Sequence, residues 1–217
     1  MNDIKLLLFD AANTLIHKPM LWERMHIALK KNNIEVANAE LQKHHKLVSE
    51  LMFFPDRTSA TFYKNFNSEL LYSLGIIPTG QLLDDIFNSC TYLNWEAFED
   101  TKALYDIPLP KAIVSNFNST LAEKISDMFP GLFSQVITSE EAGFAKPSKE
   151  FYTHVLDSVI EKPENILYIG DSLKLDVEPA LATGMNAYLI DRIDVYPYYK
   201  DRITSLHQLH KQLNGKY

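Results

Sequence analysis

The chain of 217 residues is long enough for one sizeable hydrophobic core, or for a core and a small second domain. Its net charge of −7 argues against nucleic acid as a partner, because nucleic-acid-binding domains present a basic surface. No apolar stretch reaches the ~20 residues that span a bilayer, so no membrane partner is expected.

The cysteine content and the first residues bear on the compartment. Cys90 is the single cysteine, which excludes an intrachain disulfide and a cysteine metal cluster. Residues 1–5 lack the order of basic, apolar and small residues that signal peptides share. We therefore expect a cytoplasmic protein, either a monomer or a homodimer.

The first predicted element is a strand over residues 4–9, which is almost continuously apolar and ends at Asp10. From Pro19 to about residue 98 the apolar residues instead follow the 3.6-residue repeat of helices. This stretch is divided into four predicted helices by helix-breaking residues. The helix-breaking residues lie at 32–33, Pro55, Gly75 and 78–80. The pair His44–His45 is interpreted as part of a solvated helix face.

Strands and helices alternate in the rest of the chain. Further strands are predicted near 112–115, 135–138, 166–169 and 187–190. A helix is expected to run to about Thr183, with Gly184 as its C-cap. Strands that alternate with helices pair in parallel through right-handed crossovers. We therefore predict an α/β fold, a doubly wound parallel sheet formed by residues 1–16 and 98–217, with an inserted four-helix domain at 17–97.

Two of the predicted strands end in a carboxylate, at Asp10 and at Asp171. Ligands of parallel sheets bind at the carboxyl ends of the strands. Two acids held there repel each other and lose hydration, so they need a cation or a shared proton. The sequence therefore predicts a metal-dependent active site in which the two carboxylates lie within about 8 Å of each other.

Four segments at predicted strand ends or helix starts indicate the kind of protein to which the chain is similar. They are FDAANTL at 9–15, IVSN at 113–116, AKPS at 145–148 and IGDSLKLD at 169–176. In this order and spacing they resemble the haloacid dehalogenase superfamily, most of whose members are phosphatases. The resemblance covers nearly the whole chain, and residues 17–97 match the helical cap that many members insert after the first strand.

The resemblance implies a nucleophile and a Mg²⁺ site. Asp10 would attack phosphorus and form an aspartyl-phosphate. Mg²⁺ would be bound by Asp10, by Asp171 and by the backbone carbonyl of Ala12. Asp176 would hold a water on the ion rather than the ion itself.

The resemblance also implies residues that contact the substrate, a small phosphorylated metabolite. Lys146, which precedes Pro147, would direct its ammonium towards Asp10 and a phosphate. Ser115 would donate its hydroxyl to a phosphate oxygen, beside the backbone N–H of Asn116. Thr14, in the turn after the nucleophile, is also assigned to substrate binding.

One position departs from the family pattern. The phosphatases usually carry a second Asp two residues after the nucleophile, where it protonates the leaving group and then activates water. This chain has Ala12 there, and loss of a general acid–base typically costs about 10²–10⁴ in rate. The next residue, Asn13, stands where many members have Gly, and Asn tolerates a left-handed backbone.

The departure at Ala12 leaves several functions open. One is a phosphatase of reduced or specialised activity. Another is a phosphonate hydrolase similar to phosphonoacetaldehyde hydrolase, whose motif also has Ala at this position. That chemistry needs a lysine that forms a Schiff base, and four are available: Lys18, Lys30, Lys43 and Lys64.

Two further functions differ in their use of metal. A haloacid dehalogenase proper has a similar nucleophile turn but needs no metal, so the acidic pair Asp171 and Asp176 argues against it. A phosphometabolite-binding protein would keep the Mg²⁺ site but turn substrate over poorly.

Overall fold

The computed structural model describes residues 3–55 and 57–214, which form two compact units. One unit joins the residues up to His17 to those from Ala97 onward, and the other comprises Lys18–Glu96. Each junction differs by one residue from the expected domain boundary. Residues 1–2, at the start of the segment that argues against a signal peptide, lie outside the described part. Among the described helices, none has the length and apolar character needed to cross a membrane.

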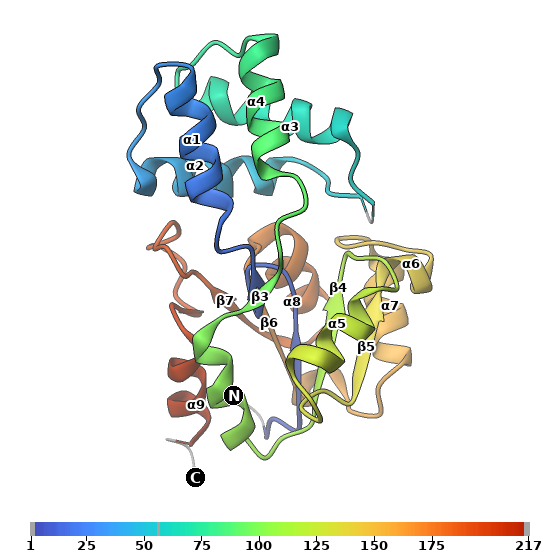
Figure 1. Cartoon of the computed structure of the whole chain (residues 1–217). Coiled ribbons are helices and arrows are strands. Elements are labelled where there is room, and N and C mark those ends of the chain that lie inside the picture. Colours follow the sequence, from blue (N-terminus) through green and yellow to red (C-terminus); the bar gives the residue numbers. More distant parts are fainter. Residues whose placement is uncertain (1–2, 56, 215–217) are drawn as a thin grey trace. The chain divides into compact units, whose positions relative to one another are not determined.

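The first unit is built on a six-stranded sheet in the order β5-β4-β1-β6-β7-β8, with every neighbouring pair parallel (Figure 1). Its strands are β1 (Leu6–Phe9), β4 (Lys111–Ser115), β5 (Gln135–Thr138), β6 (Ile166–Gly170), β7 (Asn186–Ile190) and β8 (Arg202–Ile203). The predicted α/β fold with a parallel sheet is confirmed. Strand β8 is an addition to the five predicted strands, because two residues are too few to show a periodic pattern.

Both faces of the sheet are buried, as the apolar run of its first strand requires. All four residues of β1 are buried, although successive side chains of a strand point to opposite faces. Leu6 and Leu8 belong to a core cluster with residues of α7 and α8. On the other face, Phe9 makes an edge-to-face contact with Phe133, at 6.1 Å between ring centroids. The helices of this unit are α5 (Leu121–Met128), α6 (Ser139–Ala142), α7 (Lys149–Asp157), α8 (Glu178–Ala182) and α9 (Leu206–Asn214).

Short elements account for most differences from the predicted secondary structure. The helix expected up to Thr183 is instead a π-helical turn, η3 (Leu173–Val177), followed by α8. Gly184 follows with φ +87°, the left-handed conformation expected of a C-terminal glycine. The remaining short elements are β2 (Ile16–His17), β3 (Glu96–Ala97), η1 (Glu99–Asp106) and η2 (Pro163–Asn165).

The second unit contains the four predicted helices: α1 (Leu21–Lys31), α2 (Asn38–Leu51), α3 (Ala60–Ser73) and α4 (Gly80–Cys90). Their apolar faces meet in one core cluster around residues such as Leu41, Phe66 and Leu70.

The interpretation of His45 as part of a solvated face is wrong. The ring of His45 makes edge-on contacts with Trp22 and Phe66, at 5.1 and 4.8 Å between centroids. Burial among these rings, with a smaller contribution from Lys46, lowers the pKa of His45 to about 4.

Candidate active site

Three strand ends meet at one edge of the sheet. Asp10 follows β1, Ser115 ends β4 and Asp171 follows β6. The sheet order places β1 between β4 and β6. Strands β4 and β5 therefore lie on one side of β1, and strands β6, β7 and β8 lie on the other side. Such a switch point is where open α/β sheets bind ligands, at the carboxyl ends of the strands. The topology therefore assembles a candidate site around Asp10.

The candidate site contains three carboxylates. One oxygen from each of Asp10, Asp171 and Asp176 lies within 4.8 Å of the others. This meets the expectation that Asp10 and Asp171 approach within about 8 Å. Asp10 is 7% exposed and Asp176 only 1%. Three acids are thus packed together in a mostly buried position.

Lys146 reaches this cluster from the segment before α7. Its ammonium lies 2.7 Å from Asp10 Oδ1 and 2.7 Å from Asp176 Oδ1. Burial by itself would lower the pKa of Lys146, but attraction to these two carboxylates outweighs it and the net shift is upward. Lys146 therefore remains a cation at neutral pH, in contact with Asp10 as expected from the sequence.

The negative charge of Asp10 is only partly compensated by Lys146. Burial, followed by repulsion from Asp176 and Asp171, raises the pKa of Asp10 to about 7 although Lys146 opposes the shift. A divalent cation would relieve this excess of negative charge, and carboxylate oxygens are the ligands that Mg²⁺ prefers. The donor set and its charge therefore fit a Mg²⁺ ion.

Ser115 lies beside Asp10 in the structure. The buried Ser115 hydroxyl donates to Asp10 Oδ1 at 3.1 Å. The predicted role of this hydroxyl, donation to a phosphate oxygen, stays a prediction.

The side chain of Asn116 has a contact that sequence analysis missed. Its Oδ1 accepts from the Lys146 backbone N–H at 2.7 Å, and its Nδ2 donates to the Lys146 carbonyl at 3.0 Å. The sequence assigned only the backbone N–H of Asn116 to the site. The side chain instead fixes the backbone from which the Lys146 ammonium extends.

Two further residues around Asp176 were also missed as parts of the site. The Tyr168 hydroxyl lies 3.1 Å from Asp176 Oδ1, within the same buried network. A Cβ on Gly170 would lie 2.3 Å from Asp176 Cγ, closer than packed atoms can approach. The absence of a side chain at Gly170 therefore makes room for the Asp176 carboxylate.

The turn after Asp10 is held by its own backbone. The N–H groups of Leu15 and Ile16 both donate to the Ala11 carbonyl, at 2.9 and 3.0 Å. Asn13 has φ +60°, the left-handed conformation that its identity suggested. Thr14 is fully buried, and its hydroxyl has no hydrogen-bond partner among the described residues. The predicted roles of the Ala12 carbonyl and of Thr14 stay predictions.

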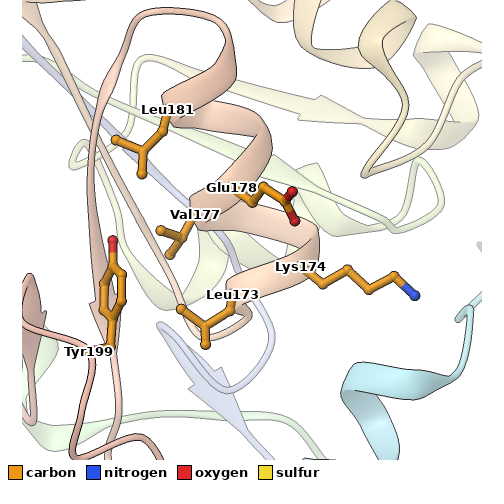
Figure 2. Close-up of a pocket in the computed structure, with 6 residues that line it drawn as sticks. All are labelled: Leu173, Lys174, Val177, Glu178, Leu181 and Tyr199. Atoms are coloured by element: carbon orange, nitrogen blue, oxygen red, sulfur yellow. The ribbon is translucent and has the colours of Figure 1, made fainter.

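A surface depression of about 320 Å³ is lined by residues of η3 and α8 and by Tyr199 (Figure 2). Figure 2 shows Leu173, Val177 and Leu181 facing Tyr199, while the ammonium of Lys174 points away from them. Neither Asp10 nor Lys146 lines it. The depression is therefore separate from the candidate active site.

Comparisons with known proteins identify the family of the chain. The family model of the haloacid dehalogenase-like hydrolases matches residues 4–184. Haloacid dehalogenase-like hydrolase domain-containing protein 3 of Danio rerio is 30% identical over 125 residues, covering 52% of this chain and 51% of the relative. Glyceraldehyde 3-phosphate phosphatase of Methanopyrus kandleri is 25% identical over 206 residues, covering 87% of this chain and 84% of the relative. The chain spans about half the length of curated relatives such as the first of these.

Solved structures show the same fold. The HAD-hydrolase YfnB from Bacillus subtilis, bound to magnesium, has a TM-score of 0.66 and 22% identity, covering 98% of this chain and 100% of that chain. L-2-haloacid dehalogenase from Xanthobacter autotrophicus has a TM-score of 0.63 and 18% identity, covering 99% and 100%. The family-model match over most of the chain and the shared fold lead to one conclusion: the protein belongs to the haloacid dehalogenase-like hydrolases.

Proposed function

We propose that this hydrolase is a Mg²⁺-dependent phosphatase that acts on a small phosphorylated metabolite through an aspartyl-phosphate at Asp10. The observation that carries the proposal is the contact of Lys146 and Ser115 with Asp10 inside a buried cluster of three acids. The substrate class is supported by relatives named as glyceraldehyde 3-phosphate phosphatases. In this reading the four-helix unit corresponds to the helical cap that many members of the family carry.

In the first step an Asp10 carboxylate oxygen attacks phosphorus, and the bond from phosphorus to the leaving oxygen breaks. The Lys146 ammonium, next to Asp10 Oδ1, offsets negative charge on the transferred group. Mg²⁺ would be held by Asp10, Asp171 and the Ala12 carbonyl, with Asp176 further out. When bound, the ion would neutralise charge on the phosphoryl group.

The second step is hydrolysis of the aspartyl-phosphate by water. In this chain the residue at position 12 is alanine, which can neither protonate the leaving group nor take a proton from water. We therefore expect the rate to depend strongly on the leaving group. Aryl phosphates, whose phenolate leaves without much protonation, are expected to react faster than alkyl phosphates.

A panel of aryl and alkyl phosphates, assayed with and without Mg²⁺, tests the proposal. Asp10→Asn should abolish turnover because an amide is not a nucleophile, and it should leave the fold intact. Asp127→Asn is the matched control, since Asp127 is an exposed carboxylate on α5. Turnover by Asp10→Asn at most of the wild-type rate would contradict the assignment of the nucleophile.

The same panel separates two alternatives. Mg²⁺ binding without turnover of any phosphate would favour a phosphometabolite-binding protein. Release of halide from a 2-haloacid without Mg²⁺ would favour a dehalogenase, although the acidic pair Asp171 and Asp176 speaks for a metal-dependent reaction.

Phosphonate hydrolysis is the second candidate, and one observation favours it. Burial lowers the pKa of Lys18, whose ammonium lies 4.9 Å from the centre of the Trp95 ring. A lower pKa increases the fraction of neutral amine that can condense with an aldehyde to an imine and water. Borohydride reduction in the presence of phosphonoacetaldehyde should then label the Lys18 peptide. No label on Lys18, Lys30, Lys43 or Lys64 would remove this candidate.

A further inference from the structure

Arg192, just after β7, connects two segments that are distant in sequence. Its Nη1 and Nη2 donate to the Asp100 carboxylate at 2.8 and 3.1 Å. Nη2 also donates to the Thr14 carbonyl at 2.7 Å. One largely buried guanidinium therefore bridges the turn that follows the nucleophile to the start of η1.

The Asp100 side of this bridge is firmly held. Asp100 is 8% exposed, and its Oδ2 also accepts from the Leu206 N–H at 2.8 Å. The Arg192 guanidinium lies 3.8 Å from the centre of the Phe98 ring, which stacks on His17 at 4.0 Å. Because a bidentate, stacked arginine has a defined geometry, Arg192 has little freedom to move.

The Thr14 side of the bridge is part of the nucleophile turn. Within this turn the Ala11 carbonyl accepts from Leu15 and Ile16, so the contacts inside the turn lie between residues 11 and 16. The hydrogen bond from Arg192 to the Thr14 carbonyl ties the turn to the rest of the unit. Hydrogen bonds to charged groups are stronger than neutral ones, so this contact has a large effect on the position of the turn.

We infer that Arg192 is a positioning residue, which holds the nucleophile turn through the Thr14 carbonyl and thereby sets the position of Ala12 relative to Asp10. The kinetic part of this inference rests on the proposed phosphatase function, whereas its structural part does not. A different explanation is that Arg192 only neutralises the buried Asp100 carboxylate. The two explanations predict different results for a double variant.

Arg192→Met keeps the aliphatic length of the side chain and removes both donors. In the metal-free protein, amide exchange of Leu15 and Ile16, measured by NMR, should accelerate about tenfold or more. With Mg²⁺ and an aryl phosphate, kcat should fall about tenfold or more while KM changes little. Arg202→Met is the matched control, because Arg202 binds Asp191 and Asp194 instead of the turn. It should leave the exchange of Leu15 and Ile16 as in the wild type.

The double variant Arg192→Met with Asp100→Asn separates the two explanations. It removes the uncompensated Asp100 charge but does not restore a donor to the Thr14 carbonyl. We expect thermal stability to recover towards wild type while the fast amide exchange and the low kcat remain. Recovery of both exchange and kcat to wild-type values would overturn the inference and leave Arg192 as a counter-ion.

A milder variant keeps the test valid if the methionine variant does not fold. Arg192→Lys retains the charge beside Asp100, but an ammonium lacks the fork that reaches both partners. It should fold and still show faster exchange at Leu15 and Ile16; unchanged exchange would overturn the inference. Absence of turnover by the wild type on any phosphate would contradict the proposed function alone, because the exchange measurements need no activity.

Discussion

The Asn116 side-chain amide and the Lys146 backbone form two reciprocal hydrogen bonds, at 2.7 and 3.0 Å. The last strand residue before Asn116 is Ser115, and Lys146 contacts Asp10. The two loops from which Ser115 and Lys146 contact Asp10 are thus hydrogen-bonded to each other. Asn116 therefore positions Lys146 through the backbone of that residue, and not through a contact with its ammonium.

Removing this contact should affect both stability and catalysis. Asn116→Ala is expected to lower the free energy of unfolding by about 1–3 kcal/mol, because two partly buried backbone groups lose their partners. It should also lower kcat, since Lys146 is held less firmly near Asp10. Urea unfolding and steady-state kinetics measure the two effects.

Asn116→Asp is the matched control for this variant. Its carboxylate can still accept from the Lys146 N–H but cannot donate to the carbonyl, so an intermediate loss is expected. A variant Asn116→Ala as stable and as active as the wild type would show that Lys146 is positioned by its ion pairs alone.

The Asp176 carboxylate fits because position 170 has no side chain. Gly170→Ala would place a Cβ 2.3 Å from Asp176 Cγ, so the carboxylate or the strand must shift. We expect a loss of about 1–3 kcal/mol in the free energy of unfolding and weaker Mg²⁺ binding by calorimetry. Gly80→Ala is the matched control, because a Cβ there meets nothing within 4 Å. Equal unfolding free energies for the two variants would argue against the close packing at Gly170.

His45 should make the stability of the helical unit depend on pH. Its folded-state pKa of about 4 is lower than the ordinary histidine value of 6.5, so the unfolded chain binds the proton more readily. The contribution of His45 to the free energy of unfolding is therefore expected to be fully present above pH 6.5 and to be lost as the pH decreases towards 4. The loss should reach up to about 3 kcal/mol, by the relation of pKa shift to free energy.

Urea unfolding at several pH values measures this dependence on His45. Replacing the ring by one that does not titrate, as in His45→Phe, should flatten the curve between pH 6.5 and 4. The same slope in wild type and variant would assign the pH dependence to other groups.

Ala12→Asp tests the missing acid–base directly. If the site is a phosphatase that lacks only this group, the variant should turn over alkyl phosphates faster, by as much as about 10²-fold. Aryl phosphates should gain less, because a phenolate leaves without needing a proton. Lower or unchanged rates on every phosphate would favour the phosphonate or binding alternatives.

The α/β fold, and the strand ends at which Asp10 and Asp171 stand, could be predicted from the sequence. Strands buried on both faces are apolar along their whole length, so a charged residue at the end of such a run is conspicuous. The same local logic identified Ser115 as a strand end and Asn13 as a residue in the left-handed conformation. Signals of this kind depend on neighbouring residues only.

The side chains that support these residues could be identified only in the folded chain. The contact of Arg192 with the Thr14 carbonyl joins positions 178 residues apart, and that of Asn116 with Lys146 joins positions 30 apart. Neither contact leaves a periodic pattern, because a side chain that binds a distant backbone needs no particular neighbours in its own segment. Likewise, Gly170 is required by the space that Asp176 occupies, which exists only once the chain has folded.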